Sequence, residues 1–463
     1  MRQRPAATVA TCVPVFMIFM DATVVNVAFP SIQASFSGTS LAGLSWVLSA
    51  YSICFAALLV PFGRLADVVS ARRVFLVGIV VFVAASGLCA LASSVPMLIA
   101  ARALQGLGGA AIAPAAQALL LASVPREQRT SAMSLLAAVA GVAAALGPPL
   151  GALLVDAGDW RLVFLINVPI GVAALLGWRV LPESLGRTRQ MPDLGGGVLV
   201  AVVVGLLALG LVQGPWWGWT DPMTIGTFLG AAVGVRLFLL RCARHPAPVV
   251  PLPLFRVRTF SAGNAGALLV GVAFYGLLLG NSLFLTSVWG WSILTTGLAL
   301  APTPLVTAVV AMPASRYAER HGPLRLLVAG AVTVAAAAVW FVAKVTGEPD
   351  FLAHWLPGAV LLGVGLGLAY PLFSAVSVVD LDADSFGLGS GVSAMTRQLG
   401  AVLGVTTLVA VIGHPAADEA LGAFRRGWLV AAAVALVAVV PALFLRHGLA
   451  ASTDPAPSRI PVT

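Results

Sequence analysis

Long apolar stretches alternate with short polar breaks along the whole chain. Each stretch is close to the roughly 20 residues that an α-helix needs to cross a bilayer. The pattern predicts fourteen membrane-spanning helices, at residues 8–30, 45–62, 74–94, 98–121, 131–155, 161–181, 195–213, 223–240, 262–286, 297–313, 324–343, 354–376, 391–413 and 427–446. The first stretch has the basic start of a signal peptide, but Asp21 and Asn26 interrupt it, so we expect an uncleaved helix.

The composition agrees with an all-α polytopic membrane protein. Of the 463 residues, 60% are hydrophobic and only 9% are charged, whereas soluble domains carry about 25% charged residues. This excludes a soluble globular protein. The net charge of +9 does not favour nucleic-acid binding, because the basic residues lie in short loops between apolar runs.

The distribution of basic residues predicts the orientation in the membrane. With the N-terminus inside, 20 basic residues fall on the inner side and four on the outer side, namely Arg161, Lys344, Arg425 and Arg426. Because basic residues are enriched in cytoplasmic loops, we expect both termini to lie in the cytoplasm. The membrane is expected to be the cell (inner or plasma) membrane. The four scattered cysteines and the absence of metal-ligand spacing predict neither a disulfide framework nor a metal site.

A weak internal repeat indicates duplicated halves. The segment Gly63-Arg64-Leu65-Ala66-Asp67 follows the second predicted helix, and Ser315-Arg316-Tyr317-Ala318-Glu319 follows the tenth. Their matching side and position favour two six-helix bundles. We therefore predict an N-terminal bundle (1–181), a two-helix insert with a cytoplasmic linker (182–260), a C-terminal bundle (261–450) and a cytoplasmic tail (451–463).

Two charged residues lie inside predicted spans at similar depths. Asp21 is expected ~13 Å and Arg102 ~8 Å from the outer face at 1.5 Å per helical residue. A carboxyl group in hydrocarbon is costly to ionise, so it can be neutral in one conformation and ionised in another, as a proton carrier requires. The alternatives are a purely structural ion pair for Asp21 and an interfacial, snorkelling side chain for Arg102.

Other residues are candidates for conformational roles. A tight cytoplasmic turn with charge pairing could latch one conformation of the protein shut. It contains Gly63, Asp67, Arg72 and Arg73, and Glu319 is the corresponding acidic residue of the repeat. The alternative is an orientation signal with a weak surface ion pair. Proline disrupts helices, so the segment with Gly147, Pro148 and Gly151 predicts a kink in the fifth helix. The kinked helix could act as a hinge or as a seal against its neighbours, or the bend could have only a structural role. Asn26, Gln105, Gly106, Arg397 and Gln398 complete the candidate hinge or substrate path.

These residues also give the sequence a family resemblance. Five segments resemble, in this order, motifs of the major facilitator superfamily, specifically its fourteen-helix drug:proton antiporter branch. They are Met20–Pro30, Gly63–Arg73, Arg102 with Gln105-Gly106, Gly147–Gly151 and Trp160–Pro169. Some positions depart from the pattern. Val68, Ser70 and Ala71 differ in the loop after the second helix, and Ala143 and Ala152 replace glycines of the fifth-helix motif.

The resemblance implies a major facilitator fold and a function. It implies two bundles rocking about a central cavity, proton coupling through Asp21 and Arg102, and export of amphipathic or hydrophobic drugs, antibiotics or a toxic metabolite. No cofactor is expected, and transport would be driven by the proton motive force. The expected partners are a small-molecule substrate, protons and the lipid bilayer. The monomer is expected to be the functional unit. A proton-coupled uptake symporter is the alternative, and a membrane-embedded enzyme is disfavoured by the lack of clustered His, Cys or carboxylates.

Overall fold

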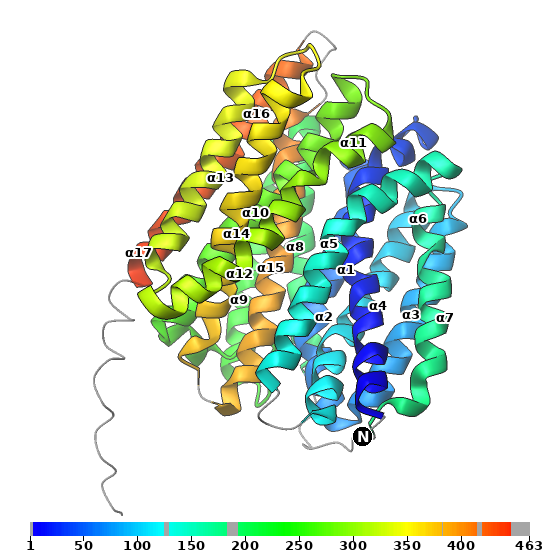
Figure 1. The fold of residues 1–463 in the computed structure, drawn as a ribbon, viewed down its shortest axis with the longest axis vertical. Helices are drawn as coiled ribbons and strands as arrows, with labels where there is room; N and C mark the ends of the chain where they lie inside the picture. Colours follow the sequence, from blue (N-terminus) through cyan, green and yellow to red (C-terminus); the bar gives the residue numbers. More distant parts are fainter. Residues whose placement is uncertain (1–2, 125–128, 183–192, 382, 414–418, 446–463) are drawn as a thin grey trace, which may run out of the picture.

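The computed structural model describes residues 3–124, 129–182, 193–381, 383–413 and 419–445, and some side chains within these ranges, including those of Asp67 and Glu319, are outside the description. The described residues form helices and connecting turns, without β-strands. The predicted all-α class is therefore confirmed. Most helices stand side by side along the long axis of the molecule (Figure 1).

The first half of the chain supplies six spans. Their helices are α1 (Gln3–Ser35), α2 (Leu41–Val68), α3 (Ala71–Ala90), α4 (Val95–Ser123), α5 (Arg129–Ala157) and a sixth span made of α6 (Leu162–Leu165), α7 (Asn167–Leu176) and the 3-10 turn η2 (Gly177–Val180). Two long helices follow, α8 (Leu194–Trp217) and α9 (Pro222–Arg244), and then the 3-10 turn η3 (Leu252–Arg256).

The second half supplies the remaining spans. They are α10 (Arg258–Ser287), α11 (Ile293–Leu300) with α12 (Pro302–His321), α13 (Leu324–Lys344), the π-helical turn η4 (Phe351–Trp355) with α14 (Leu356–Val379), α15 (Ala383–Ile412), and α16 (Ala420–Val437) with α17 (Val439–Phe444). Over the described residues, 13 helices are long and apolar enough to cross a membrane. The remaining predicted span corresponds to α5, of which only part is fully described.

Side chains at the helix starts explain where several helices begin. Oγ of Ser40 accepts a hydrogen bond from the backbone N–H of Gly43 (3.1 Å) and caps α2, and Oγ of Ser94 accepts from Met97 (3.4 Å) to cap α4. Such caps satisfy backbone donors that have no partner within the helix. Gly218 and Gly322 end α8 and α12 with positive φ angles of 99° and 80°, a conformation that favours glycine.

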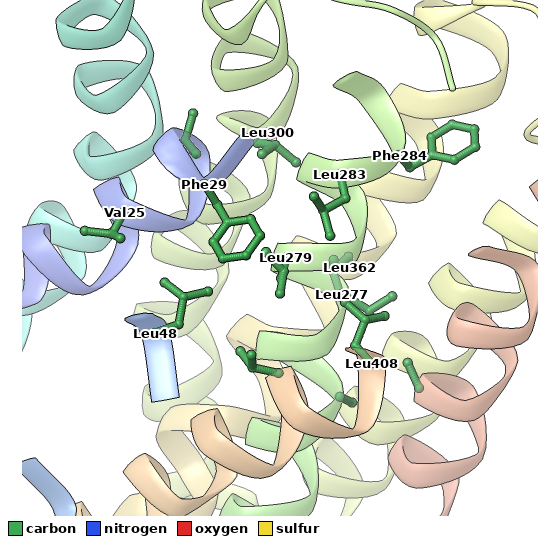
Figure 2. Packing of buried hydrophobic residues seen from close by; sticks show 14 of the residues in the cluster. Val25, Phe29, Leu48, Leu277, Leu279, Leu283, Phe284, Leu300, Leu362 and Leu408 are labelled. Atoms are coloured by element: carbon green, nitrogen blue, oxygen red, sulfur yellow. The ribbon is translucent and has the colours of Figure 1, made fainter. Parts of the chain in front are cut away.

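A buried apolar cluster joins the two halves of the molecule. It contains Phe29 of α1, Leu279 and Leu283 of α10 and Leu300 of α11 (Figure 2). The pair α8–α9 is attached elsewhere, because α8 packs against α2 and α15. Gly197 of α8 lies so close to α2 that a methyl group there would be 3.1 Å from the carbonyl oxygen of Ala57. The apolar contacts thus hold α1, α2, α4, α10 and α15 around the centre of the molecule.

Candidate functional site

An ion pair is buried at the centre of the first half. Oδ2 of Asp21, on α1, lies 2.5 Å from Nη1 of Arg102, on α4, and the side chains are 0% and 1% exposed. The interfacial alternative for Arg102 is therefore wrong, since the guanidinium is enclosed by protein.

Two amide side chains complete the surroundings of the carboxylate. Oδ1 of Asp21 accepts hydrogen bonds from Nε2 of Gln105 (2.9 Å) and from Nδ2 of Asn167 (2.8 Å). Ser86 of α3 supports both amides, because its Oγ accepts from Gln105 (2.7 Å) and from Asn167 (3.3 Å). One network therefore connects α1, α3, α4 and α7.

Arg102 is held by its own set of contacts. Its Nε donates to the carbonyl oxygen of Val47 (3.1 Å), and its Nη1 also donates to Oε1 of Gln105 (2.6 Å). The ring of Tyr51 lies 4.2 Å from the guanidinium carbon, a cation–π geometry. Gly106 allows α2 and α4 to approach closely, since a methyl group at this position would lie 3.1 Å from Cα of Tyr51.

The network offsets the cost of burying two charges. A buried ion pair stabilises a fold only when hydrogen bonds also satisfy its remaining donors and acceptors. Here both carboxylate oxygens accept hydrogen bonds from side-chain N–H groups, and all of these donors are buried. The arrangement therefore suits an ionised Asp21, and adding a proton would break at least one of these bonds.

A pocket lies beside the ion pair, between the two halves of the molecule. Arg102, Tyr51 and Asn26 line it from the first half, and Tyr275 of α10 and Gln398 of α15 line it from the second. The structure thus brings Gln398 and Asn26, two predicted substrate-path residues, to the same space as Arg102.

The predicted fifth-helix residues form a close contact between helices. Gly147 lies against Thr23 of α1, and a methyl group at Gly151 would be 3.0 Å from the carbonyl oxygen of Val24. Pro148, next to Gly147 on α5, meets the second half, because a methyl group at Gly297 of α11 would be 2.8 Å from its carbonyl oxygen. The small residues therefore let α5 pack tightly against both α1 and the second half.

Comparison with known families identifies the architecture. The chain matches the model of the Major Facilitator Superfamily over residues 11–405. The chain belongs to this superfamily. The predicted family, the major facilitator fold and the absence of an enzymatic role are therefore confirmed, and the chain is a multi-pass membrane transporter.

Several relatives of this major facilitator protein have names that describe export or resistance. The cephamycin export protein CmcT of Amycolatopsis lactamdurans is 35% identical over 459 residues, which cover 97% of this chain and 94% of that protein. The multidrug resistance protein Stp of Mycobacterium tuberculosis is 34% identical over 406 residues, 87% of this chain and 75% of that protein. Among solved structures, a bacterial homolog of the human lysosomal transporter Spinster, described as inward-facing and unoccupied, superimposes with a TM-score of 0.70 at 19% identity, covering 98% and 99% of the two chains.

The residues of the predicted cytoplasmic latch are only partly described in this transporter. Arg72 donates to the carbonyl oxygen of Trp178 (3.0 Å) and lies 5.1 Å from the centre of its ring, so it ties α3 to η2. Arg73 is exposed, and Gly63 packs against Pro114 of α4. The side chains of Asp67 and Glu319 lie outside the described residues, so the latch stays a prediction.

Some members of the site were not predicted from the sequence. Ser86 and Tyr51 carry no charge and were not singled out, and Tyr275 was missed for the same reason. Asn167 was noted only as part of a motif. Polar side chains in apolar runs are the signal that could have found them, but which helix face each residue occupies depends on tertiary packing. Arg397, next to Gln398, is half-buried, and no hydrogen bond or ion pair of its side chain occurs within the described structure.

Proposed function

We propose that the protein is a proton-coupled exporter of small amphipathic or hydrophobic compounds, such as drugs, antibiotics or a toxic metabolite. It exchanges them for protons by alternating access. It works in the cell membrane as a monomer with both termini in the cytoplasm. The export and resistance names of its relatives support the direction of transport.

The observation that carries the proposal is the buried carboxylate of Asp21 next to the pocket between the halves. Ionisable groups inside a membrane are costly, and they commonly mark ion or proton pathways. Arg102 contacts this carboxylate and also lines the pocket. A proton on Asp21 and a substrate in the pocket therefore act on the same guanidinium.

Protonation of Asp21 gives a physical step for coupling. The neutral acid loses its charge-assisted bond to Arg102, and its new O–H group needs an acceptor. Oδ1 of Asn167 is buried and has no hydrogen-bond partner among the described residues. Rotation of this amide would present that oxygen to the acid, while Arg102 keeps its bonds to Gln105 and Val47. The network then links α1, α4 and α7 differently in the two protonation states.

The contact of α5 with α1 and α11 supports alternating access. The close packing at Gly147, Gly151 and Gly297 lies on the predicted outer side and joins the two halves there. Close packing can open or close as a unit, because packed interfaces adopt discrete arrangements rather than deform continuously. We infer that protonation and substrate release change the stability of this contact.

Transport by purified protein in liposomes tests the proposal. A panel of amphipathic antibiotics is first screened with cells that express or lack the protein, and a compound that is excluded is then used with an imposed pH gradient. Asp21→Asn should abolish pH-driven movement. Asp159→Asn is the matched control, because Asp159 forms an exposed ion pair with Arg161 at 2.6 Å, 40% and 38% exposed.

Binding and direction complete the test. Asp21→Asn should still bind the compound without a gradient, which shows that the variant is folded. If it transports under a pH gradient as fast as the parent, proton coupling by Asp21 is wrong. Accumulation of the compound by expressing cells would instead support the uptake symporter.

A further inference from the structure

The lining of the pocket carries positive charge and no carboxylate. It consists of Ala22, Asn26, Leu48, Tyr51, Ser52, Arg102, Tyr275, Gln398, Ala401 and Val405, which include one cation. The adjacent Arg397 adds a second positive charge without an ion pair in the part of the chain that the structure describes. The negative charge of Asp21, in the first half, neutralises the charge of Arg102 but not that of Arg397.

Arg102 offers an unused donor group to this pocket. Its Nε and Nη1 atoms make all its hydrogen bonds, to Val47, Asp21 and Gln105. The amino group Nη2 has no hydrogen-bond partner among the described residues, although the side chain is only 1% exposed. A guanidinium donor that no protein acceptor satisfies can bind a ligand, so a ligand oxygen at this position gains a hydrogen bond to a charged group.

The remaining polar groups of the pocket can orient such a ligand. The side chains of Ser52, Tyr275 and Gln398 line the pocket and make no hydrogen bonds to other residues within the described ranges. Leu48, Ala401 and Val405 supply apolar walls. A few convergent polar groups on apolar walls are the chemistry of sites for small amphipathic molecules. At about 20 Å³ the pocket must widen to admit one, which the separation of the halves during alternating access provides.

We propose that the substrate is an uncharged amphipathic molecule that presents a carbonyl oxygen to Nη2 of Arg102. This inference rests on the proposed exchange function and specifies its substrate class. Asp21, when ionised, holds Nη1 and so keeps Nη2 directed to the pocket. Protonation of Asp21 removes one of the three hydrogen bonds that hold the guanidinium, so Nη2 is then held less firmly towards the substrate.

The charge of the substrate follows from two arguments. A lipophilic cation would be repelled by Arg397, and it would find no carboxylate in the lining, because the charge of Asp21 is already neutralised by Arg102. An anion would bind more tightly when Asp21 is protonated, because the local charge is then more positive. By reciprocity, the anion would also favour proton binding, which is the sign for co-transport and not for exchange.

An uncharged substrate makes the exchange electrogenic. Each cycle that protonates Asp21 once moves one positive charge inwards and a neutral molecule outwards. A membrane potential, negative inside, should therefore drive export even without a pH gradient.

A series of matched probes tests the binding part with the full-length protein in detergent. The probes are 2-(hydroxymethyl)fluorenone, its counterpart 2-(hydroxymethyl)fluorene without the ketone, fluorenone-2-carboxylate, and the 2-(trimethylammoniomethyl)fluorenone cation. The uncharged ketone should bind roughly tenfold or more tightly than the hydrocarbon, the change expected for a hydrogen bond to a charged group. It should also bind more tightly than the cation and the carboxylate.

Two variants assign the effect to named residues. Arg102→Lys keeps the positive charge but not the forked donors, so the ratio of ketone to hydrocarbon affinity should fall to about one. Gln398→Glu places a carboxylate in the pocket and should raise the affinity for the cation on the order of tenfold. Both tests use ratios of probes within one variant, so a general loss of folded protein does not imitate them.

The outcomes separate this inference from the proposed function. Tightest binding of the cation or the carboxylate, or equal binding of ketone and hydrocarbon, would overturn the substrate class while leaving proton coupling intact. Loss of coupling in the Asp21 test leaves the binding series interpretable, because that series uses no gradient. In liposomes, transport of the ketone that does not respond to a potential imposed with K⁺ and valinomycin would contradict electrogenic exchange.

Discussion

Oδ2 of Asp21 and Nη1 of Arg102 lie 2.5 Å apart although 81 residues separate them in the chain. Neither residue has another partner of opposite charge within the described structure. Removing one of them therefore leaves the other as an uncompensated charge in the interior, which is more costly than removing both.

Double substitution of this pair should consequently be milder than the single ones suggest. Asp21→Asn and Arg102→Gln should each lower the free energy of unfolding by about 3–5 kcal/mol. The double variant should lose clearly less than their sum, because no isolated charge remains. Thermal melting in detergent measures the three variants. Additive losses would mean that the two side chains do not interact across the buried contact.

Asn167 should matter for coupling more than for substrate binding. Asn167→Leu removes a hydrogen bond to the Asp21 carboxylate and the acceptor available to the protonated acid. We expect pH-driven transport to fall about tenfold, the effect of losing a hydrogen bond to a charged group, while substrate affinity stays within about twofold.

Asn264 of α10 is the matched control for this change. It is also buried, its Nδ2 donates to the carbonyl oxygen of Phe260 (2.8 Å), and its Oδ1 has no partner within the described residues. Asn264→Leu should alter stability without a selective loss of proton-driven transport. Equal coupling losses in both variants would show that a buried asparagine, and not contact with Asp21, is what matters.

The sequence predicted the membrane architecture well because hydropathy is a local property. All fourteen apolar runs coincide with helices of the structure. The helix limits were less accurate. The tenth span begins at Ile293 and is divided before Pro302 into α11 and α12, whereas the apolar run starts at residue 297. Proline at the first position of a helix explains this division, since its ring suits a helix start.

The site was predictable only where charge made residues conspicuous. Asp21 and Arg102 were paired from their depths alone, because a helix advances by 1.5 Å per residue. Ser86, Tyr51 and Tyr275 depend on the rotation of their helices, which tertiary packing determines. The same holds for the small residues. Gly363 and Gly367 of α14 lie against α12, and methyl groups there would be 2.6 Å and 2.9 Å from the carbonyl oxygens of Thr303 and Thr307.

The hairpin of α8 and α9 should depend on Asp193 for stability but not for coupling. Oδ1 of Asp193 accepts from the backbone N–H of Gly196 (2.7 Å), which caps α8, and from Nε of Arg241 (2.7 Å), at the end of α9. Asp193→Ala should lower the free energy of unfolding by about 1–2 kcal/mol, mainly through the lost cap, and preserve the dependence of transport on the pH gradient.

Asp221→Ala provides the comparison for Asp193, because Asp221 caps α9 (2.8 Å) at an exposed site. Its cost should be smaller, about 0.5–1 kcal/mol. Melting curves and liposome transport measure both variants. A selective loss of pH-driven transport in Asp193→Ala would instead assign the hairpin a part in coupling.

The contact of Gly297 with Pro148 and Ala152 should control the outer opening. A methyl group at Gly297 would lie 2.8 Å from the carbonyl oxygen of Pro148, so α11 and α5 must separate to accommodate it. Gly297→Ala should destabilise the closed contact between α5 and α11 by about 1–3 kcal/mol. The protein should then shift towards an outward-open state and transport more slowly. Gly226→Ala on α9 is the control, since its methyl group has no atom within 4 Å.

Distances between spin labels measure this shift directly. Leu91 and Leu352 follow α3 and precede α14, are both 73% exposed, and lie on the predicted outer side of the two halves. Cysteines introduced at both positions, in a background without the four native ones, should report a longer distance in Gly297→Ala than in the parent or in Gly226→Ala. If transport is impaired but the distribution of label-to-label distances is unchanged, the substitution at Gly297 acts on a step other than opening of the α5–α11 contact.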